Sequence, residues 1–437
     1  MKKKYVFAIL SVMFSQLPVY AVGSGIELGS GARAMAFANN HTAVAKDLSA
    51  VYWNPAALAF LPVREVQMSF DGMRMYGTSD IWGPGITIPH GAKMSDHRDR
   101  LRLSGIGVMS AIPTLQGGLT LAALFDRPYI FDDFTVYTYN YDKNDEIGTF
   151  ELDGRMYGDL NRLSGAFGVQ VAPKIAAGLT LSVVFGTDRQ SAIQKDMGRT
   201  FIDDEDYIDH FDYYDVEFEN RYLGYALTVG VIGHPLDILR IGLKVDIHSN
   251  VGYRETWFYK LDPADNRIRS DRGKGRAHSA PSGSLGLGLI LPWLTAALDA
   301  RVTLPYTFIL PESIPDDAQA GRFKFGVGIG LEAPIPGAPI VLRAGYSYDD
   351  YDLYPMIHKH EGDRIDWMDE ENFMGRGFWP ETNRHTIAGG IGYFTSGIGF
   401  ELSYAYQLWG ISGSFTASDF RQDYSSHRVM ASIIYRY

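Results

Sequence analysis

The residue types that usually carry enzyme chemistry are present in this sequence, but not in the patterns that catalysis requires. His248, His385 and His427 could each act as a base beside a serine, yet no G-x-S-x-G segment or other nucleophile signature accompanies them. The 437 residues include no cysteine, so a thiol nucleophile is excluded as well. The sequence therefore predicts a protein that is not an enzyme and needs no cofactor.

Two polar segments share the composition of metal sites without their geometry. His358 and His360, together with Glu361 and Asp363, offer donor atoms for a divalent metal, but we interpret their segment as a solvated outer loop. The acidic run over 203–215 lacks the glycine and the ligand spacing of an EF-hand. We predict no metal site. We hypothesise that the acidic loop weakly recruits Ca²⁺ or bridges the cations of lipopolysaccharide.

Arg301 and Arg343 are the candidate partners for the carboxylate of an amphipathic ligand, because a guanidinium matches the two oxygens of a carboxylate. Aromatic side chains in a polar stretch are candidates for the first apolar contact with such a ligand, or for an extended rim. These candidate entrance residues are Tyr129, Phe131, Phe134 and Tyr137.

Strands must position these residues, because one pattern repeats from about residue 64 to residue 437. Leu179, Leu181 and Val183 alternate with Thr180 and Ser182, which is typical of a strand with one apolar and one small or polar face. Tight Pro/Gly turns and long polar stretches alternate between such segments, so the long loops are expected at one end. The fourteen segments are 64–75, 101–111, 117–126, 157–172, 177–188, 214–233, 238–249, 280–291, 294–307, 321–334, 338–349, 383–394, 397–409 and 424–437.

A soluble β-sandwich also alternates, but its outer face is charged and it needs neither strands this long nor loops sorted by length. A membrane β-barrel has long strands, short turns at one end, longer loops at the other and aromatic residues at both rims. Tyr346, Tyr404, Tyr435 and Tyr437 stand where rim aromatics belong. The sequence thus predicts an all-β, membrane-spanning antiparallel barrel of about 14 strands over residues 63–437.

Residues 1–21 are predicted to be a secretory signal peptide. Lys2 to Lys4 form a basic start, an apolar stretch follows over 5–17, and Val19 and Ala21 occupy the −3 and −1 positions. The alternative, an anchor helix, is too short, because 13 apolar residues span only about 20 Å of a ~30 Å hydrocarbon core. The net charge of −11 argues against a nucleic-acid partner.

Residues 22–62 break the alternation and are rich in small side chains. This segment could remain outside the barrel as an arm or fold into the lumen as a plug. We favour the plug because inward strand positions are repeatedly glycine, which leaves room for a plug, water or a ligand. The glycines are Gly286, Gly288, Gly326, Gly328, Gly330, Gly390 and Gly392, and the charges expected to face the lumen are Lys244, Asp246, Asp299, Arg301, Lys324, Glu332, Arg343, Glu401 and Arg436.

The strings over 31–36 (GARAMA), 42–47 (TAVAKD) and 50–58 (AVYWNPAAL) resemble the N-terminal hatch of the FadL/TodX family of outer-membrane transporters. The pattern A-x-D-x-S-A-x-x-x-N-P-A, which the chain carries over 45–56, is the most specific part of the resemblance. The residues that match the hatch motif are Trp53, Asn54, Pro55 and Ala56. Residues 22–25 depart from the family by lacking the aromatic found near several mature N-termini.

The resemblance implies a monomeric barrel in the outer membrane of a Gram-negative cell, closed by a hatch. Long-chain fatty acids or aromatic hydrocarbons would diffuse through it passively after capture at the outer loops. Its partners would be a hydrophobic small molecule and the surrounding outer-membrane lipid and lipopolysaccharide. PorV-type relatives carry the same hatch string, so the alternative is a surface-interaction or secretion-associated barrel.

Overall fold

The computed structural model describes residues 25–27, 29–90, 95–115, 117–143, 146–201, 207–260, 269–278, 281–304, 323–350, 357–360, 383–415 and 418–437. The predicted signal peptide at 1–21 lies outside the described residues. So do Glu361, Asp363 and residues 203–206 of the acidic run. None of the helices in the described part of the chain has the length and apolar character that crossing a bilayer requires.

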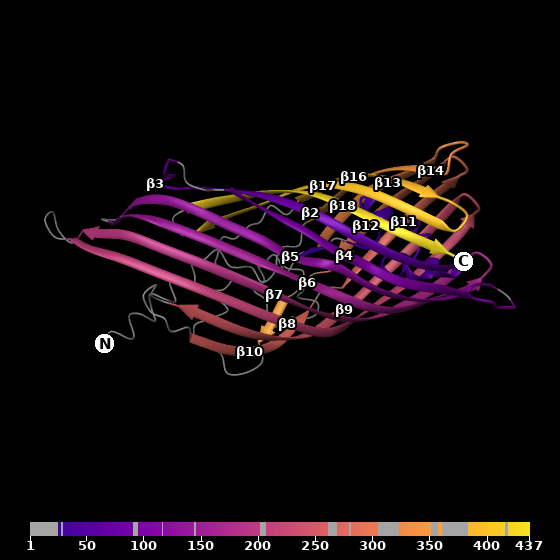
Figure 1. Ribbon diagram of the computed structural model, residues 1–437, viewed down its shortest axis with the longest axis horizontal. Helices are drawn as coiled ribbons and strands as arrows, with labels where there is room; N and C mark the ends of the chain where they lie inside the picture. Colours follow the sequence, from indigo (N-terminus) through magenta and orange to yellow (C-terminus); the bar gives the residue numbers. More distant parts are fainter. Residues whose placement is uncertain are drawn as a thin grey trace.

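Fourteen antiparallel strands close into a barrel, as predicted (Figure 1). Each pairs with the next ring strand along the chain, and the last pairs with the first, so this ring has no open edge. The ring strands are β2 (Arg64–Trp82), β4 (Ser95–Ile112), β5 (Leu119–Lys143), β6 (Glu146–Ala172), β7 (Ile175–Phe201), β8 (Tyr207–Leu236), β9 (Leu239–Lys260), β11 (Ser282–Leu291), β12 (Leu294–Thr303), β13 (Lys324–Pro334), β14 (Ile340–Asp350), β16 (Asn383–Phe394), β17 (Ile398–Phe415) and β18 (Ser418–Arg436).

Four short strands extend the sheet outside the ring. β1 (Gly25–Glu27) and β3 (Ile86–Thr87) pair with β5. β10 (Arg269–His278) pairs with the distal half of β9, and β15 (Ile357–His360) pairs in turn with β10. The side chains of β1 and β15 lie outside the described part of the structure.

The two ends of the barrel differ. Tight turns such as 173–174, 237–238, 292–293 and 395–397 all lie at the end where the chain terminates, here called the short-turn end (Figure 1). At the opposite end, called the long-loop end, β5 to β8 extend farthest. These strands reach well into the stretches 127–156 and 189–213 that the sequence predicts to be loops, so the predicted strand limits were too short there.

The plug, defined here as residues 29–62, lies inside the ring. It contains α2 (Ala32–Ala36), α3 (Ala50–Trp53) and the 3₁₀ helix η1 (Pro55–Phe60), and nearly all its side chains are buried. Contacts of α2 with β14, β16, β17 and β18, and of η1 with β5 to β8, place it against opposite walls. α2 ends at Ala36 because Ala38 and Asn39, which follow its C-cap residue Phe37, adopt positive φ angles of 50° and 66°.

Candidate functional site

The hatch-motif residues connect the parts of the plug to one another and to the wall. Asn54 Nδ2 donates to the carbonyl of Thr42 at 2.9 Å and to that of Val231 on β8 at 3.3 Å. Its Oδ1 accepts the backbone N–H of Ala56 at 3.2 Å, which caps η1. Trp53 Nε1 donates to the carbonyl of Ser30 at 2.8 Å. Pro55 stands at the first position of η1, where a missing N–H leaves no bond unmade.

Glycines on the inner wall let the plug backbone approach closely. A Cβ at Gly178 would overlap the carbonyl carbon of Pro55, and one at Gly345 would overlap that of Phe37. Of the seven inward glycines expected from the sequence, Gly286, Gly288, Gly328, Gly330 and Gly390 face plug atoms, while Gly326 and Gly392 face barrel side chains. The room that the sequence predicts is therefore filled largely by the plug.

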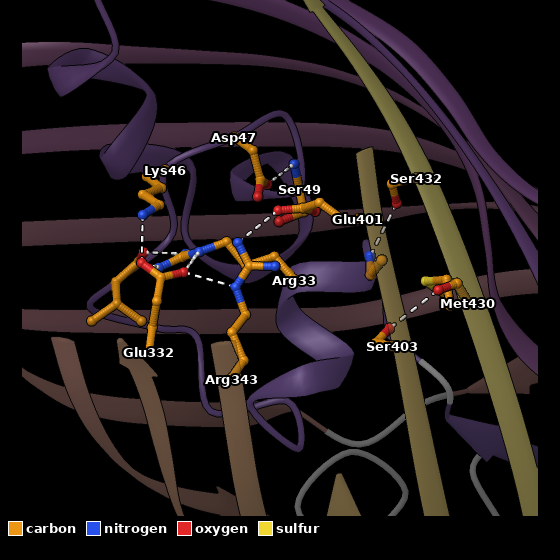
Figure 2. Close-up of polar contacts among 12 residues, drawn as sticks. Arg33, Lys46, Asp47, Ser49, Glu332, Arg343, Glu401, Ser403, Met430 and Ser432 are labelled. Carbon is orange, nitrogen blue, oxygen red and sulfur yellow. Dashed lines mark hydrogen bonds and ion pairs between the residues drawn. The ribbon is translucent and has the colours of Figure 1, made fainter. Parts of the chain in front are cut away.

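A buried ion cluster fastens the plug to the wall near the short-turn end. Figure 2 shows Arg33 and Lys46 of the plug and Arg343 of β14 converging on Glu332 of β13. Arg33 Nε and Arg343 Nε each lie 2.8 Å from Glu332 Oε2. Arg343 Nη2 lies 2.9 Å from Glu401 on β17. One carboxylate thus accepts three cations, and its loss would leave all three short of a counter-charge.

His41 is buried beside this cluster and is held neutral. Its Nε2 lies 3.1 Å from Arg33 Nη1 and accepts that N–H, since a guanidinium can only donate. Burial and the nearby charge of Arg33 lower the pKa of His41 to about 3. Protonation would therefore place a second buried cation next to the guanidinium of Arg33 inside the barrel.

We expect the folded state to lose stability as the pH falls from about 6.5 toward about 3. In that range an unfolded chain protonates His41 and the folded chain does not, so each pH unit removes up to about 1.4 kcal/mol. Unfolding by urea at pH 7.5 and pH 5.0 measures this loss. The His41→Gln variant should lose about 2 kcal/mol less than the parent protein over this interval. Equal losses in the two proteins would contradict the assignment.

Two small cavities flank the plug segment 44–47 at the short-turn end. One, of about 130 Å³, is lined by Phe60, Ile232 and Ile290 among others. The second, of about 180 Å³, is lined by Phe394 and Glu401 among others. Arg33 and Lys46 line both cavities, so the ion cluster stands between them.

The two candidate carboxylate partners lie in different surroundings. Arg343 is only 1% exposed and already contacts Glu332 and Glu401. Arg301 on β12 is 21% exposed, with its Nε 3.0 Å from Asp349 Oδ1 and its Nη1 3.2 Å from the carbonyl of Asn39. Arg301 is thus the more accessible of the two, and a ligand role for either arginine stays a prediction.

A second charged layer surrounds the face of the plug that looks toward the long-loop end. Arg162 of β6 and Lys244 of β9 lie over the ring of Tyr52, at 4.3 and 4.8 Å from its centroid. Each cation also has a wall carboxylate: Arg162 pairs with Asp126 at 3.0 Å, and Lys244 with Asp246 at 2.7 Å. This charged layer lies between the plug and the part of the barrel interior nearest the long-loop end.

Between this charged layer and the long-loop end, the strands reverse the faces on which their apolar and polar side chains lie. On β2, Val66 and Phe70 point outward and are exposed, while the inward side chains up to Asp71 are polar and buried. After Gly72 the inward positions become Met73 and Met75, both buried, and Arg74 points outward to pair with Asp99. β6 repeats the change, with inward Leu152, Met156 and Leu160 preceding inward Arg162 and Ser164.

The exchange of faces gives the half of the barrel nearest the long-loop end an apolar interior. Two clusters of packed, buried side chains form this interior, and we call the region that they occupy the apolar chamber. The first is Met73, Met75, Ile81, Ile130, Phe134, Tyr137, Leu152, Trp409 and Tyr424; the second is Phe131, Met156, Leu160, Val184, Tyr222, Val251 and Tyr253.

Three of the four candidate entrance residues, Phe131, Phe134 and Tyr137, are buried among these clusters, and Tyr129 packs against the second. The structure therefore places them within the barrel rather than on an outer rim, and their part in ligand entry stays a prediction. Sequence reasoning missed the methionines and the other aromatics of the chamber. The exchange of faces along β2 and β6 was the available signal for them.

No protein-family model matches the sequence, and no curated protein matches it either. Solved structures do match. A FadL homologue from Pseudomonas aeruginosa is 13% identical, with a TM-score of 0.63 over 94% of this chain and 99% of that chain. The Pseudomonas putida toluene transporter TodX is 13% identical, with a TM-score of 0.58 over 94% and 98%. The Ralstonia pickettii toluene transporter TbuX is 12% identical, with a TM-score of 0.51 over 92% and 98%.

These likenesses extend over nearly the whole chain, although identities of 12–13% carry information about architecture alone. They confirm, at the level of architecture, the resemblance that the hatch strings suggest. The chain has the β-barrel fold of the FadL homologue and the TodX and TbuX toluene transporters.

Proposed function

We propose that the protein is an outer-membrane channel for the passive uptake of hydrophobic compounds, such as long-chain fatty acids or aromatic hydrocarbons. The apolar chamber carries this proposal. A barrel interior that faces water should be polar, whereas a binding space for hydrophobic molecules is lined by apolar and aromatic side chains with a few polar groups. The fold that the chain shares with the toluene transporters TodX and TbuX also supports a channel for hydrophobic compounds.

The outer wall supports a membrane location for the half of the barrel nearest the short-turn end. Its outward side chains form an apolar belt that includes Leu181, Leu243, Ile329 and Leu402, all exposed. An exposed belt of this extent needs an apolar surround, which a bilayer supplies.

We also propose that the chain is exported after cleavage at Ala21. Residues 22–62 then form the hatch, and residues 63–437 form a monomeric barrel.

Two features offer a ligand a way out of the barrel. Movement of Lys46 away from Glu332 would join the two cavities beside the plug and open a path at the short-turn end. In the wall, the pairing of β4 with β5 ends at Gly105 and Asp126. Arg102 of β4, which pairs with Asp71 on the neighbouring β2, also reaches across the interruption to Asp159 and the carbonyl of Arg127.

Uptake of labelled oleate and labelled toluene by cells that lack the gene tests the proposal. We expect the rate for at least one compound to fall severalfold, and a plasmid copy of the gene to restore it. The apolar chamber is the structural reason, because its side chains offer a hydrophobic solute apolar contacts that aqueous pores lack. Unchanged uptake of both compounds would reject the proposal and favour a secretion-associated or surface-interaction role.

A further inference from the structure

Three cations form a continuous row across the outer wall. On β8 and β9, Arg221 lies directly opposite Arg254, and on β9 and β10, Arg254 lies directly opposite Lys274. Directly opposed residues in antiparallel strands point to the same side of the sheet, with Cβ atoms about 4.5–5.5 Å apart. All three side chains are exposed, and Arg221 is 73% exposed. We call Arg221, Arg254 and Lys274 the cation row.

The cation row has too few acidic neighbours to balance its charge. Arg221 pairs with Glu219 at 2.8 Å, but Arg189 also contacts that carboxylate. Among the described residues, no carboxylate lies within ion-pair distance of Arg254 or Lys274. Like charges directly opposite one another destabilise a sheet, so the row needs anions from outside the chain.

Three other cations on the outer wall differ from Arg254 and Lys274, because each of them has a carboxylate partner. Arg74 pairs with Asp99. Lys195 lies 3.2 Å from Glu151, and Arg199 lies 2.7 Å from Asp209. The cation row on β8, β9 and β10 thus carries an excess of positive charge that these three paired cations do not. It also contrasts with the net charge of −11 of the whole chain.

The cation row lies just above the apolar belt. On β8, Leu223 and Tyr225 follow Arg221 on the same face toward the short-turn end, and they are 67% and 58% exposed. A strand rises about 3.3 Å per residue, so these side chains lie about 7 and 13 Å from Arg221 along the strand. Tyrosine is typical of the membrane interface, and a cation one step above it reaches the headgroup layer.

We propose that the cation row binds the phosphate groups of anionic lipid headgroups in the outer leaflet. Guanidinium groups bind phosphate oxygens in pairs, and the ammonium of Lys274 adds a point charge beside them. The spacing of the row suits a headgroup that carries more than one phosphate, because adjacent cations can each bind one. This inference rests on the membrane location proposed above, but not on the identity of the transported compound.

Native mass spectrometry of the full chain in a neutral detergent tests the inference. The probes are bisphosphorylated lipid A, monophosphorylated lipid A and phosphatidylcholine. We expect the parent protein to retain bisphosphorylated lipid A at least about fivefold better than phosphatidylcholine, with the monophosphorylated form between them. The R254Q/K274Q variant should reduce this preference to about onefold, since both unbalanced charges are removed.

The matched control is R74Q/R199Q, which removes two exposed arginines of the outer wall that have carboxylate partners. It should retain the parental preference, and heat-modifiable gel mobility should show that both variants fold. An unchanged preference in R254Q/K274Q would overturn the inference. So would loss of the parental preference in millimolar inorganic phosphate, which would indicate a site for phosphate alone. Oleate and toluene uptake by the same variants reports on the proposed function separately.

Discussion

Replacing Glu332 with glutamine is expected to release the plug from the barrel wall. The substitution removes the one carboxylate that Arg33, Lys46 and Arg343 share, and leaves the buried guanidiniums of Arg33 and Arg343 facing a neutral amide. Breaking a buried ion pair by removing one partner commonly costs about 3–5 kcal/mol. We expect the free energy of unfolding of Glu332→Gln to fall by about this amount.

A single thiol can report on plug release directly, because the chain contains no cysteine. Ala45 is buried and lines one of the cavities beside the ion cluster. In Ala45→Cys the maleimide labelling rate should be low, and adding Glu332→Gln should raise it at least tenfold. Glu151→Gln is the control, since Glu151 pairs with Lys195 on the outer wall. Equal labelling rates with and without Glu332→Gln would show that the plug does not depend on this cluster.

Placing a carboxylate in the apolar chamber is expected to block uptake of hydrophobic compounds. Met75 is fully buried on the inner face of β2, within the first chamber cluster. An unpaired charge at this position strongly favours water over an apolar ligand, because removing an ion from water costs several kcal/mol. We expect Met75→Asp to lower the uptake of oleate and toluene at least tenfold in cells that lack the chromosomal gene.

Two control variants separate this effect from misfolding. Met75→Leu keeps the volume and the apolar character of the side chain, so its uptake should remain within about twofold of the parent. Thr78→Asp adds the same charge to the same strand, but at an exposed outward position. Parental uptake by Met75→Asp, in a variant that shows normal heat-modifiable mobility, would mean that ligands do not pass through the chamber.

Period-two alternation predicts the number of ring strands and the half of each strand nearest the short-turn end. It succeeds there because, wherever lipid contacts the wall, apolar side chains point outward and small or polar side chains point inward. The alternation does not predict the half nearest the long-loop end, because there the strands continue with their apolar side chains pointing inward. The predicted segment 64–75 covers only part of β2, since Ser79 and Ile81 continue its inward face beyond the apolar outward residues. The sequence predicts a loop over 127–156 because the outward side chains of this stretch are polar. In the structure, β5 and β6 occupy nearly all of it.

The plug shows what a strand pattern leaves open. Alternation places Glu332 and Arg343 on the inner face, but it does not give the height of the plug or the cation that reaches each carboxylate. Arg33 and Glu332 are 299 residues apart in the chain, so only the closed barrel brings them together. The inward glycines predict the plug better than the alternation does. A glycine on the inner wall indicates that another part of the chain approaches closely, although it does not identify that part.

The position of the plug in the chain also determines when it can be seated during folding. The plug precedes β2, the first ring strand, yet its main ion pair is with β13 and its first helix packs on β16, β17 and β18. An N-terminal segment waiting for these strands carries unbalanced charge until most of the sheet has formed, and closing such a long loop has an entropic cost. Final docking of residues 29–62 is therefore coupled to completion of the ring. A barrel with its last strands missing would leave α2 without the strands it packs on, and this part of the N-terminal segment open to proteases.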